Sequence, residues 1–434
     1  MKTYLISKVQ KVETILFFLT TLFLPTQLGK HFWPASSSIF SLRIDYLSPT
    51  VYFWDILMLS LISVFLIRIR QQKQWQINNL FLLIYAFFFL TQSLSLLNSI
   101  NPEASYVRLK DLFISGLFGL YISSLPLTRI KKYLLPALTI SLIFTCLLAA
   151  LQFLTGKTIG FWFLGERDFD VSTPLIARFN FYEQVFLRPY ATFPHPNMLA
   201  AFLILALPLV NFFLSQKFKK LLLINFFLTS STIFITFSRP ALLLIGLQIL
   251  INFRRFWKFL LILLALSFPL LFVRLSSIFT FDSLAVLRRQ ELSEYALKIF
   301  PEYPFLGVGL NNFLNVLSLD HVLIGTNRFL QPVHNIFLLS LSETGMIGLL
   351  GFTALLVSGI VLCLKNTSVF SKILLGNLII LIFLGLFDHY FLTLPQGQRL
   401  LFMFIGLAFV KDLNSSNSSG TLSREQSQGP KFLQ

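Results

Sequence analysis

The sequence predicts an all-α, polytopic membrane protein. Of its 434 residues, 55% are apolar and only 12% are charged, whereas soluble domains carry roughly 25% charged residues. The apolar residues gather in runs long enough to cross a bilayer, with short polar breaks between them. We therefore expect a single integral membrane domain over residues 1–410, followed by a polar, disordered cytoplasmic tail over residues 411–434.

About twelve transmembrane helices follow from the lengths of these runs. They are expected at residues 12–28, 51–67, 79–97, 109–125, 134–154, 197–214, 221–236, 240–252, 258–273, 336–364, 373–388 and 399–410. The short pair 221–236 and 240–252 fits a re-entrant hairpin equally well. The run 336–364 is too long for one upright span, so we expect its first part to tilt or to pack within the protein.

The basic residues predict the orientation of the chain in the membrane. Alternate loops and the two chain ends hold twenty of the 35 Lys and Arg residues but only three of the 18 acidic ones, a surplus equal to the whole formal charge of +17. Because cytoplasmic loops carry such a surplus, we expect both termini inside and the loops 155–196 and 274–333 outside. The charge is then a topology signal, and we expect no nucleic-acid partner.

Four clusters of polar residues lie in the predicted outer segments, next to spans. In chain order they contain Arg188, His195 and Asn197; Ser238 and Arg239; Arg288 and Arg289; and His334 and Asn335. A carboxylate, Glu343, follows the last cluster inside an apolar run. A charge there is costly unless it is paired, so we expect Glu343 to be a buried structural residue.

The third cluster opens a segment, 289–300, whose apolar residues recur at helical spacing. These residues are Leu292, Tyr295, Ala296, Ile299 and Phe300. The pattern predicts an amphipathic helix lying on the outer membrane surface. The following Gly307, Val308 and Gly309 lack the third glycine and the preceding strand of a dinucleotide-binding loop. We expect a tight turn there, or a close backbone approach to a bulky group.

Taken together, the four clusters resemble the O-antigen ligase and polymerase superfamily, the GT-C type glycosyltransferases of the bacterial envelope. The matching pieces are R-x-x-x-x-F-x-H-P-N at 188–197, S-R at 238–239, an arginine fifteen residues before Pro304 with G-V-G-x-x-x-F at 307–313, and H-N-x-x-L-x-x-x-x-E-x-G at 334–345. The resemblance covers residues 188–348. Ala191 and Pro240 depart from the usual pattern, and neither change removes a charged group.

The resemblance implies an inverting transfer of a glycan from a polyprenyl (undecaprenyl) diphosphate to an acceptor hydroxyl, outside the bacterial cytoplasmic membrane. It implies His334 as the general base. Arg239 and Arg289 would hold the diphosphate, because a guanidinium binds phosphate oxygens bidentately. The expected substrate-binding residues are Arg188, Arg288, His195, Asn197 and Asn335. Either arginine of the Arg288 and Arg289 pair could be the one that acts. No cofactor and no metal are expected.

Three alternatives stay open at this point. The acceptor could be a lipid A core, a second lipid-linked repeat unit, as for a polymerase, or a protein hydroxyl. The carboxylates of Glu166, Asp168 and Asp170 could bind a divalent ion, as in metal-dependent lipid-linked glycosyltransferases. A flippase for lipid-linked sugars would need no bond formation, although transporters place ionisable residues near the membrane midplane, and here they gather in outer loops.

Overall fold

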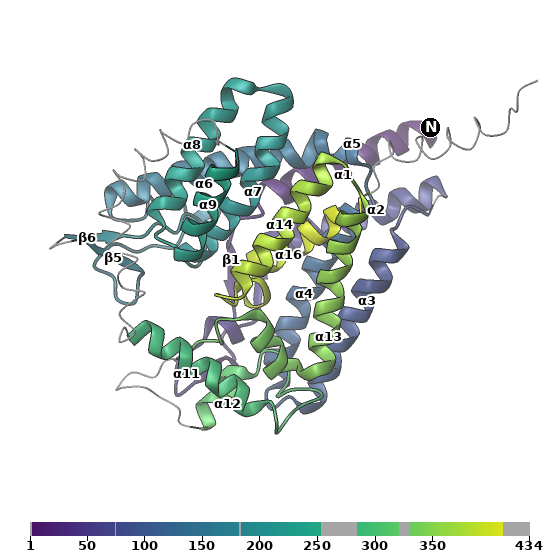
Figure 1. The fold of residues 1–434 in the computed structure, drawn as a ribbon. Coiled ribbons are helices and arrows are strands. Elements are labelled where there is room, and N and C mark those ends of the chain that lie inside the picture. The colour runs from purple at the N-terminus through teal and green to yellow at the C-terminus, as the bar shows by residue number, and fades with distance from the viewer. Residues whose placement is uncertain (1, 74, 182–183, 253–283, 321–329, 411–434) are drawn as a thin grey trace, which may run out of the picture.

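The computed structural model describes residues 2–73, 75–181, 184–252, 284–320 and 330–410, and helices dominate it (Figure 1). The α-helices are α1 (Lys2–Leu22), α2 (Phe53–Gln72), α3 (Asn79–Leu94), α4 (Pro102–Ser123), α5 (Leu127–Arg129), α6 (Leu135–Thr155), α7 (Pro196–Lys217), α8 (Lys219–Ile235), α9 (Arg239–Asn252), α11 (Leu284–Ile299), α12 (Phe313–Leu319), α13 (Ile336–Lys365), α14 (Val369–Gly385), α15 (Tyr390–Thr393) and α16 (Pro395–Ala408). A π-helical turn, η4 (Ile130–Leu134), joins α5 to α6. The predicted tail 411–434 lies outside the described residues.

Three small antiparallel hairpins interrupt the predicted all-α fold. They pair β1 (Gly29–His31) with β4 (Thr50–Tyr52), β2 (Ser38–Ile39) with β3 (Leu42–Arg43), and β5 (Arg178–Phe181) with β6 (Gln184–Leu187). All three fall in connections between helices, and only β4 reaches into the start of a predicted apolar run, 51–67. Strands this short give no alternating hydrophobic pattern that the sequence could reveal.

The helices overlap every predicted span that lies within the described residues, and the predicted span 258–273 lies outside them. Four helical segments are long and apolar enough to cross a membrane by length and composition: Asn79–Asn98, Leu127–Thr155, Pro196–Gln216 and Ile336–Lys365. Shorter apolar helices cover Arg239–Leu250 and Val369–Gly385. The chain is therefore a helical membrane protein with at least these candidate spans. The full set of about twelve stays a prediction.

Two helices form the centre of the fold. Helix α7 packs against α6, α8, α9 and α14. Of its most apolar stretch of 18 residues, 78% is buried inside the protein. Helix α16 packs against α4, α13 and α14. Each begins with a proline, Pro196 or Pro395, whose missing N–H would have no helical partner at that position.

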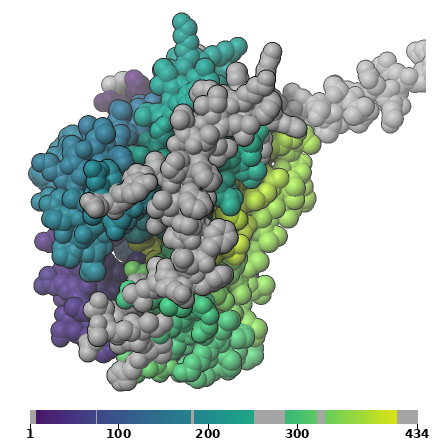
Figure 2. Space-filling model, turned by 60° about the vertical axis from the view of Figure 1, so that its left-hand side comes forward, coloured from purple at the N-terminus to yellow at the C-terminus, as the bar shows by residue number. Residues whose placement is uncertain are grey.

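Helix α11 forms at the place where the sequence predicts an amphipathic helix. Its apolar residues Leu292, Tyr295, Ala296 and Ile299 are buried in a cluster with Phe313 and other residues of α12, α13 and their connections. The apolar face is thus covered by the protein rather than turned to lipid. In Figures 1 and 2, α11 and α12 lie at the end of the molecule opposite the start of α1.

Helix α13 is broken at Gly345, whose backbone has φ 63° and ψ −166°. The segment 304–309 fills the break through backbone hydrogen bonds. Val308 N donates to Ser342 O (3.0 Å), Gly309 N to Glu343 O (2.9 Å), and Met346 N to Pro304 O (2.9 Å). The first part of this long apolar run therefore packs within the protein, as its length suggests. The bulky group that the glycine turn approaches is the backbone of α13.

Glycine is required on both sides of this contact. A Cβ at Gly345 would stand 2.3 Å from the carbonyl carbon of Phe305, and one at Gly307 would stand 2.4 Å from that of Glu343. Both glycines also have positive φ. The Glu343 side chain accepts a hydrogen bond from Phe313 N (3.3 Å), on the segment that follows the turn. This contact agrees with the buried structural role expected for Glu343.

Replacing Gly345 by alanine is expected to lower the free energy of unfolding by roughly 2 kcal/mol or more, because of the overlap with Phe305 and the unfavourable φ. Gly376→Ala in α14 is the matched control, since no atom lies within 4 Å of the added Cβ and alanine is the better helix former by roughly 1 kcal/mol. Thermal unfolding of the purified protein in detergent measures both. Equal midpoints for the two variants would contradict the contact described above.

Candidate functional site

A buried carboxylate, Asp388, joins the start of α7 to the start of α13. Asn197 Nδ2 donates to Asp388 Oδ2 (3.0 Å), and His334 Nδ1 lies 3.3 Å from Asp388 Oδ1. The backbone N–H of His389 also donates to Oδ1 (2.9 Å). The side chain of Asp388 therefore connects two of the four clusters found in the sequence.

Arg188 extends this chain of hydrogen bonds to a third cluster. Its Nη2 donates to Asn197 Oδ1 (2.8 Å) and its Nε to Thr236 O (2.7 Å). Thr236 stands two residues before Ser238 in the turn between α8 and α9. A continuous set of contacts thus runs from Thr236 through Arg188, Asn197 and Asp388 to His334.

His195 and Asn335, from the first and the last of these clusters, act as helix caps. His195 caps α7, its Nδ1 accepting from Asn197 N (3.1 Å). Asn335 caps α13, its Oδ1 accepting from Phe337 N (2.8 Å) and Leu338 N (3.1 Å). These contacts satisfy N–H groups that have no partner within the helix. They also hold the backbone beside Asn197 and His334 in place.

Arg239 and Arg289 approach this network from two other helices. Arg239 is the first residue of α9, and the positive charge of Arg289 on α11 acts on Arg239. The charge of Arg289 also lowers the pKa values of Asp388 and His195. The three predicted catalytic residues, His334, Arg239 and Arg289, therefore belong to one electrostatic environment.

Arg288 and Arg289 differ in how far their side chains are exposed. Burial raises the pKa of Glu291, three residues along the same helix from Arg288, and the charge of Arg288 offsets part of this rise. The side chain of Arg288 is half-buried and that of Arg289 is exposed. The spacing to Pro304 already favours Arg289 of this pair, and the charge of Arg289 also acts on Asp388.

The charge states within the network follow from burial and pairing. Burial alone would raise the pKa of Asp388, but the hydrogen bond with His334 and the nearby charges of His334, His389 and Arg289 hold it well below its usual range. Burial lowers the pKa of His389 to about 3. Burial, aided by the guanidinium of Arg188, lowers that of His195 to about 3. At neutral pH Asp388 is an anion, and these two imidazoles are neutral.

The sequence analysis did not identify Asp388 or His389. Both stand at the end of a predicted span, 373–388, whereas α14 ends at Gly385. The sequence did contain a sign of them. An aspartate followed by a histidine at the end of an apolar run costs free energy unless the two residues have partners or a function. His389 lies beside His334, with 5.0 Å between the ring centres, and its Nδ1 is 2.7 Å from Thr393 Oγ1.

Among the described residues, His334, Asp388 and His389 form one cluster with the dimensions of a metal site. Their ligand atoms lie within 4.8 Å of one another. Both imidazole nitrogens of His334, Nδ1 of His389 and both oxygens of Asp388 are engaged in hydrogen bonds. Metal independence stays a prediction from the sequence.

The rival metal ligands in the loop after α6 have other roles. Glu166 is buried and accepts hydrogen bonds from Gln152 Nε2 and from three backbone N–H groups, at 2.6–2.9 Å. Asp170 accepts from the backbone of Ser172 and Thr173. These carboxylates stabilise turns of the loop, so their geometry gives the divalent-ion alternative no support.

Arg108, a buried arginine like Arg188, connects two loops beside the site. Arg108 on α4 donates through Nη2 to Asn311 Oδ1 (2.9 Å), and through Nη1 to the carbonyl of Thr393. Asn311 follows the glycine turn, and Thr393 ends α15, the short helix after His389. Arg108 therefore fixes the turn at 307–309 relative to the loop that carries Asp388.

The helices and the buried polar network together define a membrane protein whose candidate site is built from helix ends. Residues 221–353 match the model of the O-antigen ligase family, Wzy_C, so this part of the chain is an O-antigen ligase family domain. The resemblance seen in the sequence is confirmed. The matched segment contains Arg239, Arg289 and His334, and it excludes Arg188, Asn197 and Asp388. No curated protein matches the chain.

The buried histidine predicts how stability depends on pH. Below pH 6.5 the unfolded chain takes up a proton on His389 that the folded chain, with a pKa of about 3 there, does not. Stability therefore falls as the pH falls through 6.5, by about 2 kcal/mol at pH 5 for this group. His389→Gln keeps a hydrogen-bonding side chain and removes the titration, so its unfolding midpoint should fall less between pH 7.5 and 5. Parallel losses in variant and parent would contradict this assignment.

Proposed function

We propose that this protein is a membrane glycosyltransferase that moves an oligo- or polysaccharide from a polyprenyl (undecaprenyl) diphosphate to an acceptor hydroxyl at the outer face of the cytoplasmic membrane. The observation that carries the proposal is the pairing of His334 with the buried anion Asp388, and the charge of Arg289 acts on both Asp388 and Arg239. The O-antigen ligase family match over residues 221–353 supports the same class of reaction.

His334 acts as the general base. Because Asp388 is ionised, it accepts a hydrogen bond from His334 Nδ1–H, and this fixes the tautomer in which Nε2 has a free lone pair. The side-chain oxygen Oε1 of Gln331, which can only accept, lies 3.1 Å from Nε2. The two contacts of the ring together therefore fit the imidazolium that follows proton transfer, and Nε2 gains its lone pair when that proton leaves. Oε1 of Gln331 occupies the place of the acceptor hydroxyl, whose proton Nε2 takes as the hydroxyl oxygen attacks the anomeric carbon. Asp388 stabilises the imidazolium that results.

Arg239 and Arg289 hold the leaving diphosphate. As the new glycosidic bond forms, the bond between the anomeric carbon and the diphosphate oxygen breaks, and negative charge grows on that oxygen. Two guanidinium groups that repel each other gain most from an anion placed between them. The first turn of α9, which starts at Arg239, adds backbone N–H groups and a positive helix end. Attack opposite the diphosphate inverts the anomeric carbon.

The hydrogen-bonded residues next to this centre position it. Arg188 and Asn197 hold Asp388, so their polar groups serve the general base rather than the substrate directly. His195 and Asn335 orient the helix starts that carry Asn197 and His334. Arg288 is half-buried, and its charge acts on Glu291. We therefore assign the direct contacts with donor and acceptor to His334, Arg239 and Arg289.

The acceptor distinguishes a ligase from a polymerase. In a ligase the hydroxyl belongs to a lipid A core, and in a polymerase it belongs to a second lipid-linked repeat unit. Both reactions need the same base and the same pair of arginines. The product formed from each acceptor therefore decides between them.

Loss of the general base should abolish transfer. His334→Ala is expected to lower the transfer rate by about 10²- to 10⁴-fold, and Asp388→Asn by about 10-fold or more, because the imidazolium loses its counter-charge. The measurement incubates the purified full chain in lipid vesicles with a polyprenyl-diphosphate oligosaccharide and either acceptor. It then follows the joined product and donor binding separately.

His31→Ala is the matched control, because His31 is a half-buried histidine in the hairpin of β1 and β4, where it contacts Ser48 and Thr50. It should keep nearly full activity. Arg289→Gln should weaken donor binding far more than Arg288→Gln. Full product formation by His334→Ala would refute the assignment. Movement of the donor across the membrane without product, in the parent protein, would identify a transporter.

Transfer should not depend on a divalent metal. Base catalysis by His334 and charge neutralisation by two arginines leave no step that requires one, so we expect the rate to be unchanged after EDTA treatment. Loss of activity with EDTA and its recovery with added Mg²⁺, Mn²⁺ or Zn²⁺ would instead assign His334, Asp388 and His389 as metal ligands.

A further inference from the structure

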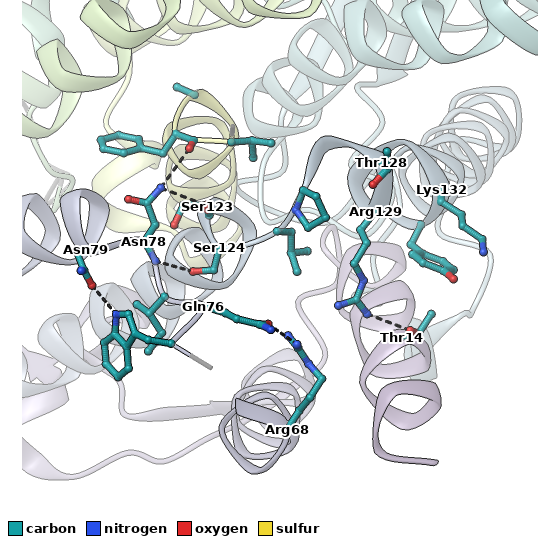
Figure 3. A pocket seen from close by; sticks show the side chains of 18 of the residues that line it. Thr14, Arg68, Gln76, Asn78, Asn79, Ser123, Ser124, Thr128, Arg129 and Lys132 are labelled. Atoms are coloured by element: carbon teal, nitrogen blue, oxygen red, sulfur yellow. Dashed lines mark hydrogen bonds between the residues drawn. The ribbon is translucent and has the colours of Figure 1, made fainter. Parts of the chain in front are cut away.

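A large hollow lies at the opposite end of α13 from His334. It has a volume of about 2050 Å³ and is formed where α2, α4, α13 and α16 end and where α3 and α5 begin (Figure 3). Helix α13 ends at Lys365, and its part after the break at Gly345 alone extends for about 30 Å at roughly 1.5 Å per residue. The hollow is therefore independent of the candidate active site.

The lining of this hollow is strongly basic. Five cationic side chains line it: Lys11, Arg68, Arg129, Lys132 and Lys365. None of the described lining residues is acidic. These cations come from four separate parts of the chain, so the fold, and not a local run of charge, brings them together.

Glu13, which pairs with two of these cations, is already neutralised. Glu13 is fully buried, and it pairs with Arg68 and with Arg129, whose Nη1 lies 3.1 Å from Oε1. The hydroxyl of Tyr121 donates to the same oxygen (2.9 Å). These contacts fix the two arginines in the wall of the hollow. Lys11, Lys132 and Lys365 have exposed side chains and leave the wall with a net positive charge.

The position of the hollow corresponds to the end of the membrane spans. The candidate spans Asn79–Asn98 and Leu127–Thr155 begin beside it, and Ile336–Lys365 ends there. Trp75 and Tyr133 also line it, and Trp75 is 65% exposed. Tryptophan and tyrosine at span ends mark the level of the lipid headgroups.

We propose that this hollow binds the phosphate of an anionic membrane phospholipid, of the phosphatidylglycerol or cardiolipin class. The five cations supply the charge and the donors for phosphate oxygens. Leu80 and Leu362 in the same lining offer an apolar surface for the first part of the acyl chains. Soluble phosphate compounds share the anion but have no use for this apolar surface or for the location at the span ends.

Lipids that remain bound to the purified protein provide the test. The full chain is reconstituted in vesicles of equimolar phosphatidylglycerol and phosphatidylcholine, extracted in mild detergent, and analysed by native mass spectrometry. The double variant Lys132→Gln, Lys365→Gln is expected to retain phosphatidylglycerol about fivefold less than the parent. Lys372→Gln, an exposed lysine at the start of α14 that does not line the hollow, should retain as much as the parent.

Separate thermal unfolding measurements distinguish the source of the phosphate. Phosphatidylglycerol should raise the unfolding midpoint of the parent protein, whereas inorganic phosphate at millimolar concentration and phosphatidylcholine should not. The same rise with inorganic phosphate alone would overturn the lipid assignment. Equal lipid retention by parent, double variant and control would overturn the site itself. Should the double variant unfold, Lys11→Gln on α1 tests the same wall from another helix.

Discussion

A carboxylate inside a protein needs partners that compensate for its lost hydration. The buried Asp388 is such a carboxylate. Its partners are Asn197 and His334, 191 and 54 positions away in the chain. The start of α7, the start of α13 and the loop after α14 must therefore meet at one point. This meeting gives the imidazole of His334 a fixed orientation and a fixed tautomer, on which the proposed base catalysis rests.

The break in α13 at Gly345 helps to position the start of this helix, where His334 lies. An unbroken helix would continue in a straight line from His334, and its backbone N–H and C=O groups would be closed to outside partners. The glycine conformation opens two turns of backbone to the segment 304–309, which carries the chain from α11 to α12. The histidine end of α13 and the arginine-bearing helix α11 are thereby fixed to the same short piece of chain.

Much of this architecture could be predicted from sequence, because hydropathy and charge respond to the membrane directly. Helix positions, the glycine turn and the clusters containing His334, Arg239 and Asn197 followed from local patterns. Asp388 was missed because averaging hydropathy over a window assigned it to an apolar run. Periodicity identified the helix at 289–300, but it could not tell lipid from protein as the cover of its apolar face. The spacing to Pro304 favoured Arg289 over Arg288, whereas the effect of its charge on Asp388 depends on the tertiary structure.

The polar network draws on segments inside and outside the stretch that matches the family model. Residues 221–353 supply the imidazole and two guanidinium groups, whereas the anion that orients the imidazole, and the amide and guanidinium that hold that anion, come from elsewhere in the chain. A graft of this stretch into a related protein would therefore transfer the reactive groups without their support. Over evolutionary time, substitutions at Asn197 and Asp388 should be coupled to changes at the start of α13.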